Sequence, residues 1–203
     1  MGSRTQKGGA RFILPKYVFY LTGIDCYVKI TQMKNIYLVG FMATGKTCVG
    51  KELAKRFNRE FFDLDDLIER KENMAIVDIF KQKGEPYFRK IEKEIVKKIS
   101  LKEDLVVGCG GGAIVDKDGL AILKKSGLVI CLKADANTIL ERTKVTTQRP
   151  LLNVQDPKGR VNDLLKKRES FYNQADYSVD TTNLEIGEVV DKIIIIIKGE
   201  NTS

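Results

Sequence analysis

Gly40-Phe41-Met42-Ala43-Thr44-Gly45-Lys46-Thr47 follows a short apolar run, residues 36–39, and opens an amphipathic stretch that is predicted to be helical. A glycine-rich turn between a strand and a helix is typical of a phosphate-binding loop. Glycine permits backbone angles that direct N–H groups toward a polyanion, and the helix N-terminus adds partial positive charge. Lys46 can reach β- and γ-phosphates, and the Thr47 hydroxyl suits Mg²⁺. The residues predicted to bind a nucleotide here are Gly40, Ala43, Thr44, Gly45, Lys46, Thr47 and Cys48.

Strand and helix patterns alternate around this loop, which favours an α/β fold with a parallel sheet covered by helices on both faces. The runs predicted as strands are 35–39, 60–63, 104–108, 128–132 and 177–179. The predicted helices are 46–57, 64–72, 76–82, 85–100, 117–126, 135–143, 158–173 and 186–198. The isoleucine run 193–197 is assigned to the last helix because apolar residues repeat there at helical spacing, with charged residues opposite.

The net charge of +8 does not indicate a nucleic-acid partner, because half of it belongs to residues 1–33, which hold five basic residues and one acidic residue. In the rest of the chain lysine alternates with glutamate, as on solvated helix faces. No stretch approaches the ~20 apolar residues of a membrane span. We therefore expect neither nucleic acid nor a membrane as a partner. We also expect a monomer that acts in the cytoplasm.

Histidine is absent from the chain. Any acid–base step must then use a carboxylate, Lys, Tyr or Cys, and Ser-His and Cys-His catalysis are excluded. The four cysteines, Cys26, Cys48, Cys109 and Cys131, share no metal-ligand spacing. Because Cys109 and Cys131 lie in apolar runs, we expect them to be buried free thiols of a protein in a reducing compartment.

The length of the chain favours a single domain. Met33 and Lys34 immediately precede the first predicted strand. We interpret residues 33–203 as the folded domain and residues 1–32 as an N-terminal extension, which is a tag, a mistranslated segment or a disordered arm.

Three carboxylates gather where the second predicted strand gives way to a helix: Asp63, Asp65 and Asp66. One of them can serve as the helix N-cap. The carboxyl ends of parallel strands are where ligands bind in open α/β sheets. A carboxylate at that edge can hold Mg²⁺ through water or accept a hydrogen bond from a substrate hydroxyl.

The segment 143–159 is polar, contains two prolines, and lies between two helical patterns. A long irregular loop in a compact domain is often a lid over an active site. Arg149 lies at its centre, in Arg-Pro-Leu-Leu. We predict that this segment is a lid.

Arg89 and Arg168 lie on two other predicted helices, and Glu92 follows Arg89 on the same helical face. Either arginine alone would more often be a solvated charge or a surface ion pair. Together with the backbone N–H groups of Gly110, Gly111 and Gly112 they can form an anion pocket, and the guanidinium fork suits a carboxylate. An aspartate for hydroxyls beside arginines for a carboxylate predicts a small hydroxylated acid as phosphoryl acceptor.

The combination of motifs resembles the shikimate kinases, in order and spacing, over about residues 33–198. The motifs that carry the resemblance are Gly-Phe-Met-Ala-Thr-Gly-Lys-Thr, Phe-Phe-Asp-Leu-Asp, Gly-Glu-Pro-Tyr-Phe-Arg-Lys-Ile-Glu, Gly-Gly-Gly-Ala, Arg-Pro-Leu-Leu and Lys-Arg-Glu-Ser-Phe-Tyr. The resemblance implies a three-layer P-loop kinase fold with five parallel strands in the order 2-3-1-4-5. It also implies shikimate and ATP as substrates and Mg²⁺ as cofactor.

The resemblance assigns a role to each candidate residue. Lys46 and Thr47 would serve the ATP phosphates and Mg²⁺, and Asp63 would support the metal through water. Asp65 would hold the ring hydroxyls, including the one that is phosphorylated. The carboxylate would be bound by Arg89, Arg168, Gly110, Gly111 and Gly112, with Glu92 orienting Arg89. Arg149 would close with the lid onto the transferred phosphate, and Arg142 would pack against adenine.

Two positions depart from the family pattern. Ala43 replaces a glycine that is common in the phosphate loop, which is tolerable if its backbone angles are ordinary. The segment 181–185 lacks a proline that some members carry on the adenine side.

Two alternatives stay open at this point. A gluconate kinase of the same fold would also phosphorylate a hydroxylated acid, and only the motif set favours shikimate. A non-catalytic relative would keep the fold for binding, although such copies usually lose groups such as Lys46, Asp65, Arg89 and Arg149.

Overall fold

The computed structural model describes residues 13–14, 17–18, 34–113, 117–144 and 155–200. The chain separates into two compact units, residues 1–33 and 34–203. In the first unit, strands β1 (Ile13–Leu14) and β2 (Tyr17–Val18) pair antiparallel. All the elements described below belong to the second unit.

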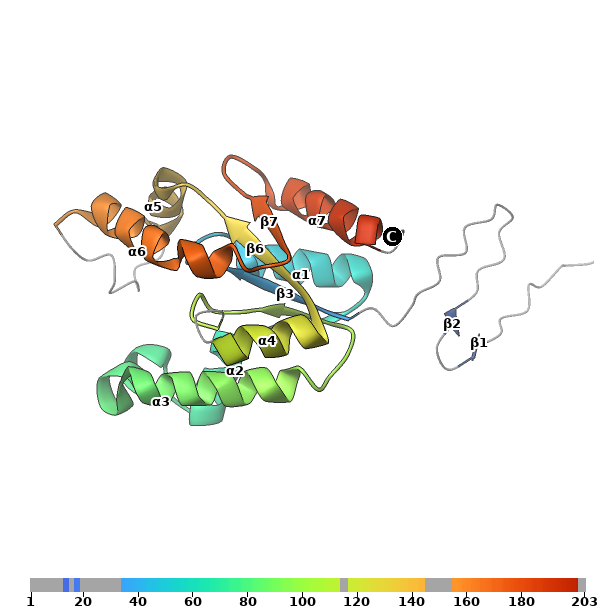
Figure 1. Ribbon diagram of the computed structural model, residues 1–203, viewed down its shortest axis with the longest axis horizontal. Coiled ribbons are helices and arrows are strands. Elements are labelled where there is room, and N and C mark those ends of the chain that lie inside the picture. The colour runs from blue at the N-terminus through green and yellow to red at the C-terminus, as the bar shows by residue number, and fades with distance from the viewer. Residues whose placement is uncertain (1–12, 15–16, 19–33, 114–116, 145–154, 201–203) are drawn as a thin grey trace, which may run out of the picture. The chain divides into compact units, whose positions relative to one another are not determined.

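The second unit is built on a five-stranded parallel sheet (Figure 1). Its strands are β3 (Asn35–Gly40), β4 (Glu60–Asp63), β5 (Leu105–Gly108), β6 (Gly127–Lys133) and β7 (Tyr177–Asp180). They lie in the order β4-β5-β3-β6-β7. Numbered from β3 along the chain this is 2-3-1-4-5, which confirms the predicted order. Every residue of the central strand β3 is buried, as expected for a strand covered on both faces.

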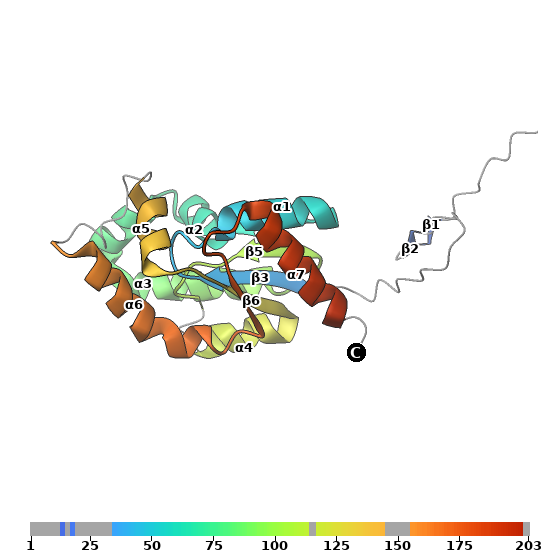
Figure 2. The same cartoon turned by 90° about the horizontal axis from the view of Figure 1, so that it is seen from above.

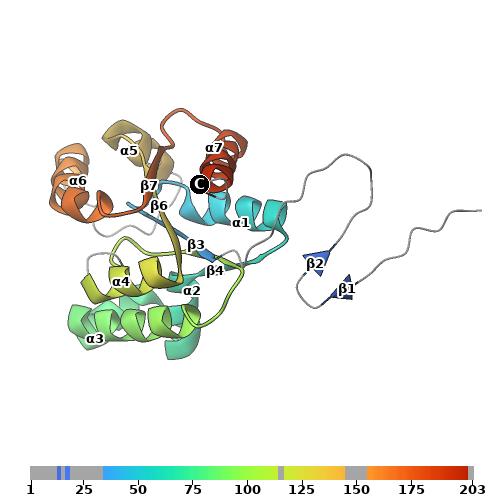
Figure 3. The same ribbon diagram turned by 45° about the vertical axis from the view of Figure 1, so that its right-hand side comes forward.

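Helices cover both faces of this sheet (Figure 3). In the described part of the chain they are α1 (Lys46–Phe57), α2 (Leu64–Glu72), α3 (Ile76–Ile99), α4 (Lys117–Ser126), α5 (Ala136–Lys144), α6 (Pro157–Tyr172) and α7 (Ile186–Glu200). Helices α1 and α7 pack on one face, and α3 and α4 on the other (Figure 3). Helices α5 and α6 lie side by side at one end of the sheet (Figure 2).

The isoleucine run confirms its helical prediction. It lies in α7, where Ile193 is fully buried and Ile195 is 70% exposed. That contrast is the signature of an amphipathic helix with one face on the sheet.

The predicted helices 76–82 and 85–100 are confirmed as two helical segments of one element, α3, which is interrupted between them at Gly84, where φ is 78° and ψ is 170°. The predicted lid is shorter at its C-terminal end, because α6 begins at Pro157 and the Asp156 side chain caps it by accepting from the Gly159 N–H at 2.9 Å. The centre of the predicted lid, residues 145–154 with Arg149, lies outside the described residues.

The register of the sheet brings three loops to one edge. Gly108 at the end of β5 lies opposite both Leu38 in β3 and Asp63 in β4. The phosphate loop, the first residues of α2 and the glycine turn after β5 therefore emerge beside one another, at the carboxyl ends of the strands. Among the described helices, none is long and apolar enough to cross a membrane.

Candidate active site

The phosphate loop has the backbone that its glycines permit. Gly40 has a φ of 142° and Gly45, the N-cap of α1, a φ of 93°. A Cβ at Gly40 would overlap the Leu132 carbonyl of the neighbouring strand β6. Glycine at position 40 therefore meets both a conformational and a steric requirement.

Ala43 does not meet the condition set for it from sequence. Its φ is 60°, in the left-handed region, so its backbone angles are not ordinary. This conformation costs an L-residue with a Cβ roughly 1–2 kcal/mol. Local sequence gives no sign of the strain, because the geometry of the whole loop imposes it. Neighbouring groups must stabilise the loop in this state.

The carbonyl groups of the loop accept hydrogen bonds from side chains of the loop and from α1. Lys46 Nζ donates to Gly40 O at 3.0 Å and to Phe41 O at 2.7 Å, and Thr44 Oγ1 donates to Phe41 O at 2.8 Å. The Gly45 carbonyl accepts from Val49 N at 2.8 Å. The C=O and the next N–H of a trans peptide point in opposite directions. With its carbonyls held in this way, the loop directs the following N–H groups to the other side, as an anion site requires.

Asp63 and Thr47 come together although they are distant in sequence. Thr47 Oγ1 donates to Asp63 Oδ2 at 2.8 Å. The other oxygen of Asp63 accepts from Asp65 N at 3.1 Å and caps α2. Asp63 is thus both the expected helix cap and the carboxylate nearest the loop hydroxyl. Hydroxyl and carboxylate oxygens are the ligands that Mg²⁺ prefers, usually completed by water and phosphate.

Lys46 and Asp65 line one cleft of about 310 Å³. The cleft is lined by Met42, Ala43, Gly45, Lys46, Thr47, Cys48, Asp63, Asp65, Gly110, Gly111 and Arg168. Loop, carboxylates, glycine turn and one arginine therefore share a wall, as the sequence hypothesis requires. A cleft of this size, with both cationic and anionic side chains in its wall, suits a charged small molecule.

The glycine turn after β5 packs against both candidate arginines. A Cβ at Gly112 would overlap the Arg89 guanidinium, and a Cβ at Gly111 would lie 2.8 Å from Arg168 Nη1. A Cβ at Gly110 would lie 2.9 Å from Asp65 Oδ1. The absence of side chains on this turn allows the three charged groups to approach its backbone.

Two carboxylates of α3 hold Arg89. Its Nη1 donates to Glu92 Oε2 at 2.8 Å, and its Nε and Nη2 donate to Glu85 Oε1 at 3.2 and 3.1 Å. The Glu92 side chain is 5% exposed, whereas that of Glu85 is 64% exposed. Burial raises the pKa of Glu92 from its ordinary value, and Arg89 opposes that shift. The buried ion pair with Glu92 therefore fixes Arg89. The exposed ion pair with Glu85 is weak, so another carboxylate can replace Glu85 on Arg89.

Arg168 projects from α6 toward the same turn. Its guanidinium lies over the Phe41 ring, 5.6 Å from the ring centroid. The Tyr172 hydroxyl, one turn further along α6, is buried and forms no hydrogen bond within the described part of the chain. Burial raises the pKa of Tyr172, and Arg168 partly lowers it.

Arg142 lies on α5 and is not among the residues that line the cleft. It donates to Thr181 O at 2.8 Å, to Thr181 Oγ1 at 3.1 Å and to Ala43 O at 3.4 Å. It is therefore anchored between the loop and the residue that follows β7. Its predicted contact with adenine stays a prediction.

The three described cysteines are all free thiols. Cys109 and Cys131 are buried and free, which confirms their prediction, and Cys48 is exposed and free. Burial raises the pKa of Cys109, and that of Cys131 to about 11. Neither buried thiol is therefore a nucleophile near neutrality. Cys26 and Arg149 lie outside the described residues.

Known proteins share both the sequence and the fold. A family model described as shikimate kinase matches residues 42–198. The chain is 47% identical over 162 residues to the shikimate kinase of Thermodesulfovibrio yellowstonii, a match that covers 80% of this chain and 94% of that protein. The chain belongs to the shikimate kinase family. A second member, from Caldanaerobacter subterraneus, is 44% identical over 162 residues and is covered to 95%.

Solved structures of shikimate kinases extend this agreement to three dimensions. The structure of shikimate kinase from Acinetobacter baumannii in complex with shikimate superposes with a TM-score of 0.79 at 38% identity. The match covers 83% of this chain and 94% of that one. The fold is the P-loop kinase fold, and the family identifies the chain as an ATP-dependent kinase.

Sequence reasoning missed two residues beside the site, Tyr172 and Thr181. Tyr172 belongs to the Lys-Arg-Glu-Ser-Phe-Tyr motif, but no pattern in that motif shows that its hydroxyl is buried next to Arg168. Thr181 is a polar residue directly after a strand, the signal that drew attention to Asp63 and Asp65. That signal was weaker for Thr181, because the short strand β7 has few apolar residues.

Proposed function

We propose that this protein transfers the γ-phosphoryl group of ATP to the 3-hydroxyl of shikimate, giving shikimate 3-phosphate and ADP. The observation that carries the proposal is the common cleft of Lys46, Asp65, Arg168 and the glycine turn. The A. baumannii relative, whose structure contains shikimate, supports the choice of acid.

The phosphate loop would bind the triphosphate. Its N–H groups and the N-terminus of α1 would face the β-phosphate, and Lys46 would neutralise charge on the β- and γ-oxygens. Thr47 and Asp63 would hold Mg²⁺, because their oxygens already lie 2.8 Å apart in the cleft wall. The metal supplies positive charge that neutralises the phosphate oxygens.

The glycine turn and the two arginines would bind the carboxylate of the acid. The Nε and Nη2 groups of Arg89 form the edge that matches a carboxylate in a two-point contact. Glu85 holds this edge, and its exposed side chain would give way to the substrate. Glu92 would keep its contact with Nη1 and fix the orientation of Arg89.

Asp65 would orient the acceptor hydroxyl. The transition state of phosphoryl transfer is loose, so the position of the attacking oxygen matters more than its early deprotonation. The hydroxyl would donate its hydrogen bond to Asp65, which would then receive the proton as the new O–P bond forms and the bond to ADP breaks. Arg149 would add positive charge when the lid closes and excludes water.

Coupled ADP release with shikimate, with gluconate and with no acceptor tests the proposal. Turnover with shikimate alone is the expected result. Turnover with gluconate alone would overturn the choice of substrate. Tight ATP binding without turnover on any acceptor would favour the non-catalytic relative.

A further inference from the structure

Thr181 lies at a junction of three segments behind the phosphate loop. It follows strand β7 and is 2% exposed. Its hydroxyl accepts from Arg142 Nη1 at 3.1 Å and lies 3.0 Å from Lys133 O and 3.3 Å from Thr44 O. The hydroxyl therefore acts as an acceptor toward Arg142, and its single proton is shared between the carbonyls of Lys133 and Thr44.

Arg142 completes the connection to the loop. While Nη2 contacts the Thr181 carbonyl, Nη1 is shared between the Thr181 hydroxyl and the Ala43 carbonyl. We call Thr181, Arg142 and the carbonyls of Ala43 and Thr44 the Thr181 clamp. Two successive carbonyls of the loop are held in this clamp, on the side of the loop that faces β7 and α5.

The two carbonyls belong to the strained part of the loop. Ala43 has the left-handed backbone, and Thr44 lies between it and the N-cap Gly45. When the carbonyls of Ala43 and Thr44 point into the clamp, the N–H groups of Thr44 and Gly45 point the opposite way. Those N–H groups are the ones that a phosphate would use.

We propose that Thr181 is a positioning residue for the nucleotide phosphates, which acts by holding the Ala43–Thr44 segment in its phosphate-binding conformation. The proposal rests on the assignment of residues 40–47 to the ATP phosphates. It goes beyond that assignment, because a residue that follows β7, the last strand, then controls the loop after β3. Through Arg142, the same clamp links the predicted adenine side to the phosphate cradle.

Thr181→Val tests the clamp, because valine keeps the shape of threonine and removes the hydroxyl. Calorimetry with Mg²⁺ measures the dissociation constants of ATP and of inorganic tripolyphosphate, which has no adenine. We expect both ligands to bind about tenfold more weakly, the effect of leaving one buried polar partner unsatisfied. The KM for ATP should rise by a similar factor and the KM for shikimate should stay within twofold.

Matched variants separate the clamp from a general effect on the fold. Thr182→Val removes the neighbouring hydroxyl, which accepts from Asp135 N and lies outside the clamp, and should bind tripolyphosphate, which has no adenine, like the wild type. Thr181→Ser restores the hydroxyl and should restore both affinities. In an Ala43→Gly background, where the left-handed backbone carries no steric cost, the effect of Thr181→Val should shrink.

The outcomes distinguish the clamp from the function on which it rests. Unchanged tripolyphosphate affinity in a folded Thr181→Val variant would overturn the clamp alone, even if ATP bound more weakly through the adenine side. Equal rises in both KM values would also overturn it. A wild-type protein that bound neither ligand would overturn the nucleotide assignment and the clamp with it. Should the valine variant fail to fold, the same comparison with Thr181→Ala decides.

Discussion

Three residues of the candidate site contribute to it in different physical ways. Asp65 contributes a charged oxygen, Gly112 contributes the absence of a side chain, and Glu92 contributes a buried charge that fixes Arg89. Each contribution predicts a different kind of failure on substitution, so three variants separate chemistry, shape and electrostatics.

Asp65→Asn tests the chemistry. The amide keeps the size of the side chain but cannot receive the proton of the acceptor hydroxyl. We expect kcat to fall roughly 100-fold or more, while the ATP dissociation constant measured by calorimetry stays unchanged. Asp66→Asn, at the exposed neighbouring position, is the control and should keep wild-type turnover. Full activity of Asp65→Asn would remove this residue from the site.

Gly112→Ala tests the shape of the anion pocket. The three atoms nearest to the new methyl group all belong to the end of the flexible Arg89 side chain. Arg89 can move away at little cost to the fold, but it then leaves its binding position. Steady-state kinetics should show a KM for shikimate raised at least about tenfold, with the KM for ATP and the melting temperature nearly unchanged. Gly199→Ala, where an added Cβ meets no atom within 4 Å, should leave all three values unchanged. A normal KM for the acid would show that Arg89 does not bind it.

Glu92→Gln tests the electrostatics through the pH dependence of stability. Burial raises the pKa of Glu92 above its ordinary value of 4.5, so the native state binds this proton more tightly than the unfolded state. The free energy of unfolding therefore loses a contribution as pH rises from 4.5 through the raised native pKa. Urea denaturation between pH 4.5 and neutrality should show this decline in the wild type and a smaller decline in the variant. Parallel curves would contradict the raised pKa.

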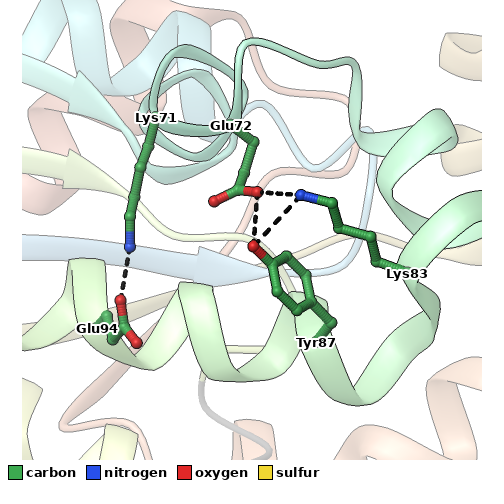
Figure 4. Close-up of polar contacts among 5 residues, drawn as sticks. All are labelled: Lys71, Glu72, Lys83, Tyr87 and Glu94. Atoms are coloured by element: carbon green, nitrogen blue, oxygen red, sulfur yellow. Dashed lines mark hydrogen bonds and ion pairs between the residues drawn. The ribbon is translucent and has the colours of Figure 1, made fainter.

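At the scale of elements, helices α2 and α3 carry Asp65 and Arg89, which are proposed to bind the acceptor acid. A polar cluster joins the two helices (Figure 4). Glu72 Oε2 accepts from Lys83 Nζ at 2.7 Å and from the Tyr87 hydroxyl at 2.8 Å. Lys83 and Tyr87 lie on either side of the Gly84 break in α3. The cluster therefore ties both segments of α3 to the end of α2, close in sequence to Arg89.

Gly84→Ala tests the break itself. The φ of 78° with ψ of 170° is a region that only glycine occupies without cost. Pro86 prevents the chain from continuing as a straight helix, because it lacks an N–H to donate. We expect the variant to lose roughly 1–3 kcal/mol of unfolding free energy, measured by chemical denaturation. Gly187→Ala, in the first turn of α7, should keep its stability, because an added Cβ there lies at an ordinary contact distance, 3.9 Å, from Arg56 Nη2. A stable Gly84→Ala variant would mean that the break is not needed.

The comparison with the sequence is clearest at this scale. The five strands and the helices around them follow from local patterns, since buried parallel strands are apolar runs and amphipathic helices repeat at 3.6 residues. Local patterns could not predict the left-handed Ala43, because the whole loop determines it. Nor could they predict the contact of Thr181 with Thr44, which joins residues 137 positions apart. The position of Asp65 next to the glycine turn was predictable only because parallel strands align their ends.

At the scale of the whole molecule, the buried core residues that the structure describes belong to the second unit. The described core residues extend from Ile36 to Ile197. Lys34 contributes a backbone contact, since its carbonyl accepts from Arg59 Nη1 at 3.2 Å. The family match likewise falls within this unit, at residues 42–198.

Removal of residues 1–33 tests this division. A chain that begins at Lys34 keeps the whole described core, so its melting temperature and its turnover with shikimate should equal those of the full chain. Differential scanning calorimetry and the coupled assay measure the two quantities. A truncated protein that is insoluble or inactive would show that the first unit contributes to the fold or to the site.

The resting position of Lys46 has a consequence for the thermodynamics of ATP binding. Its ammonium group already lies against two carbonyls of its own loop, so the freedom of this long side chain is lost when the protein folds and not when the ligand arrives. The loss of Lys46 side-chain entropy on ATP binding is correspondingly small. The loop therefore receives a triphosphate as a preorganised receptor, in which the Lys46 side chain is already ordered.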